Sequence, residues 1–227
     1  MLCNVGVRLR LCARPATAAR ARRYGCPRAP RYGCPRAPRA AMMRAVAVTR
    51  LITADDAPVL SELEQANREF LAPWSPRRSP AHYTVEGQRR AIADVLALYA
   101  NGAALPHVIL CDGVVVGRVT LSDIVGGVFC SCHLGYWLDQ DHNGRGLATA
   151  AVAEVMGIAF GELGLHRIEA GTVPDNVRSR AVLERNGFVR FGYARAYLRI
   201  GGEWRDHVLY QALSEPPPDG ALDGPAD

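Results

Sequence analysis

The pattern of apolar and polar positions becomes regular near residue 46 and predicts strands and helices in alternation. Apolar runs, continuous or alternating, predict strands at 46–51, 106–111, 114–122, 128–138, 167–173, 188–199 and 203–213. Apolar residues at helical spacing predict helices at about 53–70, 84–99 and 148–160, and a short helix within 177–186. The order β, α, α, β, β, β, α, β, α, β, β predicts one mixed sheet with helices on both faces.

The turn between the third strand of the central group and the next helix is the first candidate for chemistry. It consists of Asn143, Gly144, Arg145, Gly146, Leu147 and Ala148. A strand that enters a helix through a glycine-rich turn leaves backbone N–H groups without helical partners, and the helix dipole makes that end attractive to phosphate oxygens. The glycines permit close approach of a ligand, and Arg145 adds positive charge. The alternative is an ordinary helix start.

A second candidate segment runs from Pro174 to Phe188. It begins with a turn, continues as a short helix, and ends at Asn186-Gly187, a helix-stop signal. Asn176 and Ser179 are the polar residues of interest there. A purely structural interpretation is that Asn176 caps the helix and Ser179 lies in its first turn.

Together these segments resemble the coenzyme A-binding motifs of the GNAT acetyltransferases. The first segment is similar to their pyrophosphate-binding turn, with Asn143 where Gln or Arg is usual. The second is similar to their Asn-x-x-Ser-x-x-x-Leu-Glu-x-x-Gly-Phe block. The resemblance implies that Asn176 lies along the pantetheine arm, that Ser179 reaches toward the coenzyme sulfur, and that Trp137 and Leu138 contact the coenzyme from the preceding strand.

Further segments resemble the Rim-type branch, whose members acetylate the N-terminal amine of ribosomal proteins. They include Gly135-Tyr136-Trp137, Gly164-Leu165-His166-Arg167 and Gly202-x-Trp204-x-Asp206-His207. The similarity extends over about residues 44–213. It implies a GNAT fold, a mixed α/β (α+β) architecture with a splayed sheet of about seven strands, in which 134–138 and 167–173 part to admit the pantetheine arm. Trp74 and Tyr83 are expected to line the acceptor cleft or, equally, to pack the helices beneath it.

Charge is divided unevenly along the chain. The formal net charge is +5, but the first acidic residue is Asp55, and 11 of the 27 basic residues, all arginines, lie in residues 1–44. The rest carries 16 arginines against 22 acidic residues. This excess argues against nucleic-acid binding by the folded part and suits a cationic acceptor.

The termini differ in composition from the rest. We expect residues 1–43, which contain a tandem Arg/Pro-rich repeat at 23–38, to be disordered, residues 44–213 to form the acetyltransferase domain, and residues 214–227 to be a flexible Pro-rich tail. Three interpretations of the N-terminal segment stay open: a start codon placed too early, a basic arm, or a transit peptide.

The seven cysteines and the hydropathy pattern bear on the compartment. An odd number of cysteines without a signal peptide predicts reduced thiols and a cytoplasmic protein. Cys130 and Cys132 lack a second ligand pair, so no metal site is expected. No apolar run approaches the ~20 residues that span a membrane, and the protein is expected to be a monomer or a homodimer.

Acetyl transfer requires a neutral amine, a polarised thioester carbonyl and a proton for the leaving thiolate. A free α-amine has a pKa of about 8, so positioning is expected to matter more than a strong base. The backbone near 135–138 is expected to hold the carbonyl oxygen. By resemblance Ser179 is the acid, with Tyr136 as the alternative; Glu169 is the candidate base, and Asp206-His207 a second pair.

The leading hypothesis is an acetyl-CoA-dependent N-acetyltransferase. It would act by direct attack in a ternary complex on the N-terminal amine of a protein, most simply a ribosomal one, with contact to the ribosome left open. A small-molecule amine, such as an antibiotic or polyamine, is the alternative acceptor. A non-catalytic acyl-CoA-binding module is the alternative of another class.

Overall fold

The computed structural model describes residues 48–214. The expectations for residues 1–43 and for the tail beyond Ser214 lie outside these residues. Ser214, the first residue assigned to the tail, lies within the described part and donates its backbone N–H to the carbonyl oxygen of His166, 2.9 Å away.

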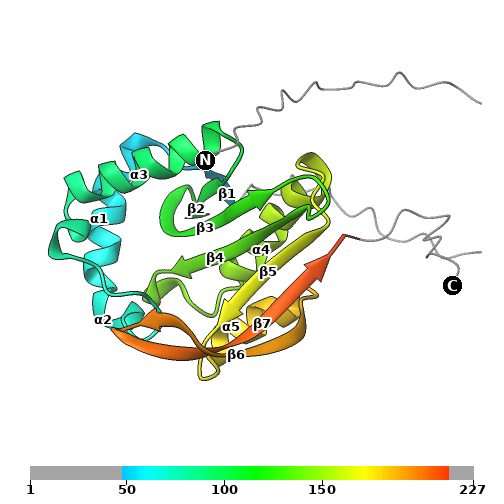
Figure 1. The fold of residues 1–227 in the computed structure, drawn as a ribbon. Coiled ribbons are helices and arrows are strands. Elements are labelled where there is room, and N and C mark those ends of the chain that lie inside the picture. Colours follow the sequence, from blue (N-terminus) through cyan, green and yellow to red (C-terminus); the bar gives the residue numbers. More distant parts are fainter. Residues whose placement is uncertain (1–47, 215–227) are drawn as a thin grey trace, which may run out of the picture. The chain divides into compact units, whose positions relative to one another are not determined.

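Seven strands form the sheet of the described residues. They are β1 (Thr49–Leu51), β2 (Leu105–Cys111), β3 (Val114–Val125), β4 (Ser131–Leu138), β5 (Arg167–Thr172), β6 (Val189–Ile200) and β7 (Glu203–Leu213). Their order in the sheet is β1-β2-β3-β4-β5-β7-β6, with β4 and β5 parallel and all other neighbours antiparallel. The expected mixed sheet of about seven strands is confirmed (Figure 1).

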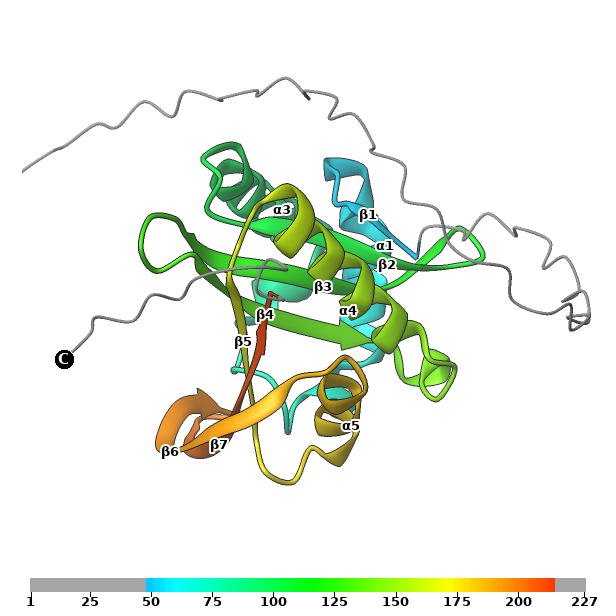
Figure 2. The same cartoon turned by 90° about the vertical axis from the view of Figure 1, so that its right-hand side faces the viewer.

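Helices cover both faces of this sheet, as expected. They are α1 (Ala57–Ala66), α2 (Arg68–Leu71), α3 (Val85–Ala100), α4 (Leu147–Gly157) and α5 (Val177–Arg185), with short 3-10 turns at Ala54–Asp56, Pro80–Tyr83 and Gln140–His142. Figure 2 shows α4 and α5 in front of the sheet and α1 behind it. Successive residues of β2 therefore enter different cores: Val108 packs with α1 and α3, and Ile109 packs with α4.

Three expected elements differ in detail. The helix expected at 53–70 is divided at the buried Asn67, where α1 ends and α2 begins. The helix expected at 148–160 starts at Leu147 and widens into a π-helical turn at Ile158–Glu162. The strand expected from residue 128 begins at Ser131, because β3 extends to Val125 and left-handed backbone at Gly127 (φ 68°) and Cys130 (φ 39°) forms the connecting turn.

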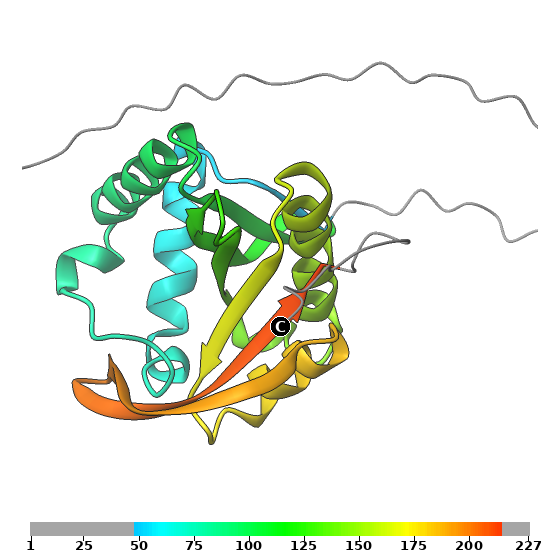
Figure 3. The ribbon, with the colours of Figure 1, turned by 45° about the vertical axis from the view of Figure 1, so that its right-hand side comes forward.

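The β6–β7 hairpin reaches the segment that follows α2. The backbone N–H of Gly201, in the hairpin turn, donates to the carbonyl oxygen of Ser75 at 3.2 Å. Figure 3 shows β7 alongside β5 and the hairpin curving toward this segment. The β6–β7 hairpin thus closes one side of the site described next.

Candidate functional site

The strands β4 and β5 are paired over only part of their length. Pairing joins Ser131 to Arg167, Cys132 to Ile168 and His133 to Glu169. Both strands continue beyond that point, β4 to Leu138 and β5 to Thr172, without pairing to each other. The facing strand edges have free backbone groups, which need a partner. A wedge between the two strands is therefore present, as expected from the resemblance.

The N-terminus of α4 lies at the end of β4 and has no side-chain cap. Gly144 and Gly146 both have φ of 78°, a left-handed conformation that glycine adopts without strain, and Gly146 is the N-cap. A Cβ atom at either glycine would meet no heavy atom within 4 Å. Open space in front of unpaired N–H groups suits a phosphate.

Asn143 has a structural part in this turn. Its side-chain amide donates to the carbonyl oxygens of Asp139 at 3.0 Å and Gln140 at 3.2 Å. The amide that replaces the usual Gln or Arg thus holds the turn together. Arg145, two positions after Asn143 in the same turn, is exposed.

A buried asparagine that the sequence reasoning missed supports the same turn. Asn67, 2% exposed at the end of α1, donates to Asp139 Oδ1 at 2.6 Å and accepts the Gln140 N–H at 2.8 Å. Asp139 Oδ2 lies 2.6 Å from His142 Nδ1. The only local signal was the position of Asn67 at the end of a helix, which equally indicates an ordinary helix stop.

The start of α5 faces the wedge from the other side. Asn176 is the N-cap of this helix, and its Oδ1 accepts the backbone N–H of Ser179 at 3.0 Å. The capping interpretation is therefore true for the side-chain oxygen. Its amide nitrogen makes no hydrogen bond among residues 48–214, so one residue can cap the helix and still donate to a ligand.

Tyr136 and Ser179 connect the two sides of the wedge. The Tyr136 hydroxyl donates to the Ser179 carbonyl oxygen at 3.0 Å and lies 3.0 Å from Ser179 Oγ. Burial raises the pKa of Tyr136 to about 12, although the hydrogen bond with Ser179 opposes the shift. Tyr136 therefore stays protonated at neutral pH, and the two hydroxyl groups form one unit.

A cavity of about 370 Å³ includes the wedge. Of the residues expected to bind the coenzyme, its lining contains Trp137, Leu138, Asn143, Ala148, Asn176 and Ser179. The residues from Gly144 to Leu147 form the turn beside it and are not part of the lining. The two expected coenzyme motifs therefore meet around one space.

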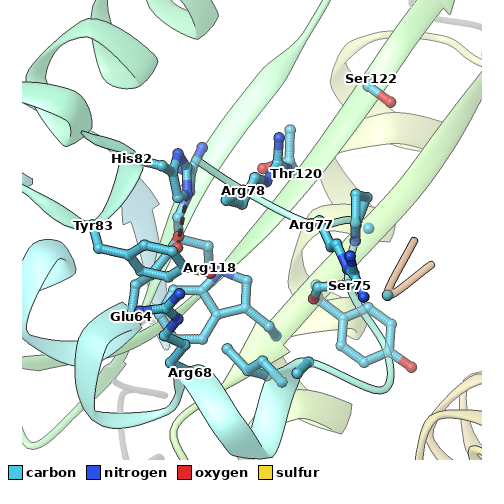
Figure 4. Close-up of a pocket in the computed structure, with 17 residues that line it drawn as sticks. Glu64, Arg68, Ser75, Arg77, Arg78, His82, Tyr83, Arg118, Thr120 and Ser122 are labelled. Atoms are coloured by element: carbon cyan, nitrogen blue, oxygen red, sulfur yellow. Dashed lines mark hydrogen bonds and ion pairs between the residues drawn. The ribbon is translucent and has the colours of Figure 1, made fainter. Parts of the chain in front are cut away.

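A second, larger cavity of about 690 Å³ adjoins the first. The two share the wall residues Leu71, Ser75, Gly135, Tyr136 and Trp137. The larger one is further lined by α1, α2, the segment 75–83 and β3 (Figure 4). Two adjoining cavities that meet at Tyr136 can bring two substrates together.

The two aromatic residues expected to line an acceptor cleft lie in different cavities. Tyr83 lines the larger cavity, where its ring lies 4.8 Å from the guanidinium carbon of Arg68. Trp74 lines the smaller cavity with Asn176 and Ser179. Segment 71–75 thus separates the cavities, and its aromatic residue faces the wedge.

The candidate bases differ in their surroundings. Glu169 lines neither cavity, and its carboxylate lies 3.6 Å from both His133 Nε2 and Arg167 Nη1. Asp206 bonds to Tyr193 and to the backbone N–H of Ala196, each at 2.8 Å. His207 lines the smaller cavity with Nδ1 3.1 Å from the Arg205 carbonyl oxygen. The structure therefore does not bring Glu169 to Ser179, and within residues 48–214 no hydrogen bond or ion pair joins the side chains of Asp206 and His207.

Two further features of the described part of the chain bear on its chemistry and location: clusters of metal-ligand side chains and long apolar helices. Residues 48–214 contain no group of three or more His, Cys, Asp or Glu side chains arranged to hold a metal ion. None of their helices is long and apolar enough to cross a membrane.

Comparisons with known proteins agree with this geometry. Residues 48–189 match the family described as acetyltransferase (GNAT) domain. A probable N-acetyltransferase, YjcK of Bacillus subtilis, is 38% identical over 167 residues, which is 73% of this chain and 92% of the relative. The ribosomal protein uS5-alanine N-acetyltransferase of Escherichia coli is 35% identical over 171 residues, 74% of this chain and 88% of the relative.

Two solved structures show the same architecture. A ribosomal-protein-S5-alanine acetyltransferase from Vibrio fischeri superposes with a TM-score of 0.71 at 35% identity, over 74% of this chain and 92% of that one. RimJ of Mycobacterium smegmatis, in complex with CoA-disulfide, superposes with a TM-score of 0.72 at 34% identity, over 75% of this chain and 83% of that one.

Proposed function

We propose that this chain, which belongs to the acetyltransferase (GNAT) family, transfers the acetyl group of acetyl-CoA to the N-terminal α-amine of a protein. The proposed acceptor is first of all a ribosomal protein. The chain is an N-acetyltransferase. Its relatives include RimJ and an enzyme named for acetylation of a ribosomal protein. Acetyl-CoA as donor and a ribosomal protein as acceptor are the steps that we propose. A ribosomal acceptor implies action in the cytoplasm.

The parting of β4 and β5 beside the uncapped end of α4 is the observation that carries the proposal. In the proposed complex the first-turn N–H groups of α4, with Arg145, hold the diphosphate of acetyl-CoA. The amide nitrogen of Asn176 and the free strand edges pair with the pantetheine amides. The thioester would then lie near Tyr136, where the two cavities meet.

Chemistry at that point needs little beyond positioning. The neutral acceptor amine attacks the thioester carbon, the carbon–sulfur bond breaks, the acceptor nitrogen gives up one proton as it becomes an amide, and the thiolate takes one up. Holding two reactants in place can supply about 7–11 kcal/mol of the barrier, more than acid–base assistance usually does. The backbone at the end of β4 is proposed to polarise the carbonyl group, as an oxyanion hole does.

The hydroxyl pair is proposed to supply the proton. With its own proton on the Ser179 carbonyl oxygen, Tyr136 can accept a hydrogen bond from Ser179 Oγ. Rotation of the Ser179 hydroxyl group redirects that proton to a thiolate in the smaller cavity, and the proton released by the acceptor nitrogen restores the hydroxyl group. Glu169 is not needed in this scheme, because about a tenth of an α-amine of pKa about 8 is neutral at pH 7.

A thiol-release assay tests the proposal. The full chain is incubated with acetyl-CoA and with peptides that carry the N-termini of ribosomal proteins, the same peptides with blocked N-termini, and small amines such as a polyamine. Acetylation of free peptide N-termini with kcat/KM at least tenfold above that of any small amine is the expected result. Preference for a small amine would overturn the protein acceptor. Calorimetric binding of acetyl-CoA without turnover of any amine would identify a binding module.

A further inference from the structure

The larger cavity is lined by an unusual number of positive charges. Four arginines contribute to its wall: Arg68 from α2, Arg77 and Arg78 from the segment before α3, and Arg118 from β3 (Figure 4). A single carboxylate, that of Glu64, lines the same space. The cavity therefore carries an excess of positive charge, opposite in sign to the balance of the domain as a whole.

In the described part of the chain, the Glu64 carboxylate forms no ion pair with these arginines. Glu64 Oε2 lies 2.8 Å from His82 Nε2 and is held by that contact. Within residues 48–214 the guanidinium groups of Arg68, Arg77, Arg78 and Arg118 make no ion pair. The His82–Glu64 pair instead fixes the segment that carries Tyr83, because Gln88 also donates to the His82 carbonyl oxygen at 2.8 Å.

Arg118 has the least favourable environment of the four. It is partly buried on β3, opposite Trp137 of β4, and its side chain makes no hydrogen bond among the described residues. Burial lowers the pKa of Arg118; Glu64 opposes the shift and Arg78 adds to it. A partly buried cation without a partner is destabilising, and an anion in the cavity would remove that cost.

The cavity also lies where an acceptor must enter. It shares Gly135, Tyr136 and Trp137 with the cavity of the wedge. Thr120 and Ser122 add hydroxyl groups along the same face of β3 (Figure 4). A molecule whose amine reaches Tyr136 from this side therefore has its neighbouring groups among the arginines.

Resting on the proposed function, we propose that the acceptor is an acidic peptide N-terminus, whose carboxylates beyond the reacting amine are bound by Arg68, Arg77, Arg78 and Arg118. Planar guanidinium groups bind carboxylates in pairs of hydrogen bonds, which gives direction as well as charge. This inference reverses the cationic acceptor expected from the overall charge, because only the charges beside the bound substrate act at short range without screening.

Matched peptides test it. Hexapeptides with free N-terminal alanine carry Asp or Glu at positions 2–4, the isosteric Asn or Gln, or Lys. We expect kcat/KM about 10- to 100-fold higher for the acidic peptide than for its amide counterpart, and lowest for the lysine peptide. The advantage should shrink in high salt. Equal kcat/KM for the acidic and amide peptides would overturn the proposal.

Variants then assign the effect to the cavity. Two substitutions, Arg118→Gln and Arg78→Gln at an exposed position, should each reduce the preference for the acidic peptide at least threefold. That preference is the ratio of kcat/KM for the acidic peptide to kcat/KM for the amide peptide. The KM for acetyl-CoA should stay unchanged. Arg90→Gln is the matched control: Arg90 lies on α3 outside the cavity, 3.2 Å from Glu86, and its loss should leave the ratio unchanged. A ratio unaffected in folded Arg78→Gln protein would overturn the assignment, even if Arg118→Gln fails to fold.

A binding measurement separates this inference from the proposed function. N-acetylated forms of the same peptides, which cannot react, are titrated into the protein by calorimetry. Tighter binding of the acetylated acidic peptide, lost in Arg78→Gln, supports the anion site even if no peptide is turned over. A small anionic amine such as glutamate, acetylated more efficiently than every peptide, would overturn the peptide assignment.

Discussion

The two adjoining cavities are built in different ways. The smaller one takes most of its wall from two short stretches of chain, 134–148 and 170–183, and offers backbone groups and the Tyr136–Ser179 hydroxyl pair. The larger one is lined by residues from α1, α2, the segment 75–83, β3, β4 and the β6–β7 turn, and offers guanidinium groups. Backbone groups suit a ligand that never changes, whereas side chains can be exchanged singly to suit another acceptor.

The larger cavity also differs in charge from the domain as a whole. From residue 45 onward, 22 acidic residues outnumber 16 arginines, yet four of these arginines converge on the larger cavity. An overall charge describes long-range attraction and solubility. The substrate contacts only the charges that folding brings to one place.

Among the substitutions considered, Gly87→Ala is expected to disturb the wall of the larger cavity most. A Cβ atom there would overlap the carbonyl oxygen of Ala81, in the turn that carries His82 and Tyr83. Gly87→Ala should lower the free energy of unfolding by about 3 kcal/mol, because neither backbone segment can move away cheaply. Thermal denaturation should show a loss of about 6–12 °C. Gly161→Ala, at a position with no atom within 4 Å, is the control. A Gly87→Ala protein with an unchanged melting temperature would contradict the close approach.

Gly146→Val tests the turn beside the smaller cavity, where the backbone N–H groups and Arg145 are proposed to bind the diphosphate. The substitution places a β-branched residue at φ of 78° and a side chain in front of the first turn of α4. The KM for acetyl-CoA should rise about 100-fold, which corresponds to about 2.7 kcal/mol, while the KM for the acceptor changes little. Gly157→Ala, at the other end of α4, should bind normally. Calorimetry that finds wild-type affinity in Gly146→Val would refute the diphosphate site.

The hydroxyl pair at the boundary of the two cavities should give a smaller effect. Ser179→Ala should lower kcat about 10- to 100-fold with little change in acetyl-CoA binding, as expected for a contact made in the transition state. Tyr193→Phe, an exposed tyrosine bonded to Asp206, is the control. If kcat of Ser179→Ala stays within twofold while Tyr136→Phe is severely impaired, the proton comes from Tyr136. Near-normal rates in both variants would mean that solvent supplies it.

The smallest expected change is in the pH profile. The kcat/KM for a peptide should rise through about pH 8 as its α-amine loses a proton, then stay level to about pH 10. A raised pKa means that the acid form persists to higher pH, and the pKa of Tyr136 is about 12. Rates measured from pH 6 to 10 with stability controls check this. A fall with an apparent pKa near 9 would point to a different proton donor.

The expected elements show where sequence patterns are reliable. All seven strands and the main helices occur, because burial of one face imposes a period that the residues themselves display. The division of the first helix at Asn67 was not predicted, because its reason lies 72 residues away in the side chain of Asp139. The π-helical turn after α4, the longer β3 and the later start of β4 are likewise departures that apolar spacing does not reveal.

The sequence by itself determined the strands, the main helices and the glycine turn before α4, because each of these is a short contiguous segment whose backbone conformation follows from local glycines, caps and apolar period. The wedge between β4 and β5 was expected from the resemblance to the GNAT family. Only the tertiary structure decided which side chains line the two cavities. Trp74 and Tyr83 lie nine residues apart and line different cavities. The four arginines span 51 positions and line one cavity, because the direction of a side chain depends on how separate elements pack, and no local pattern records that.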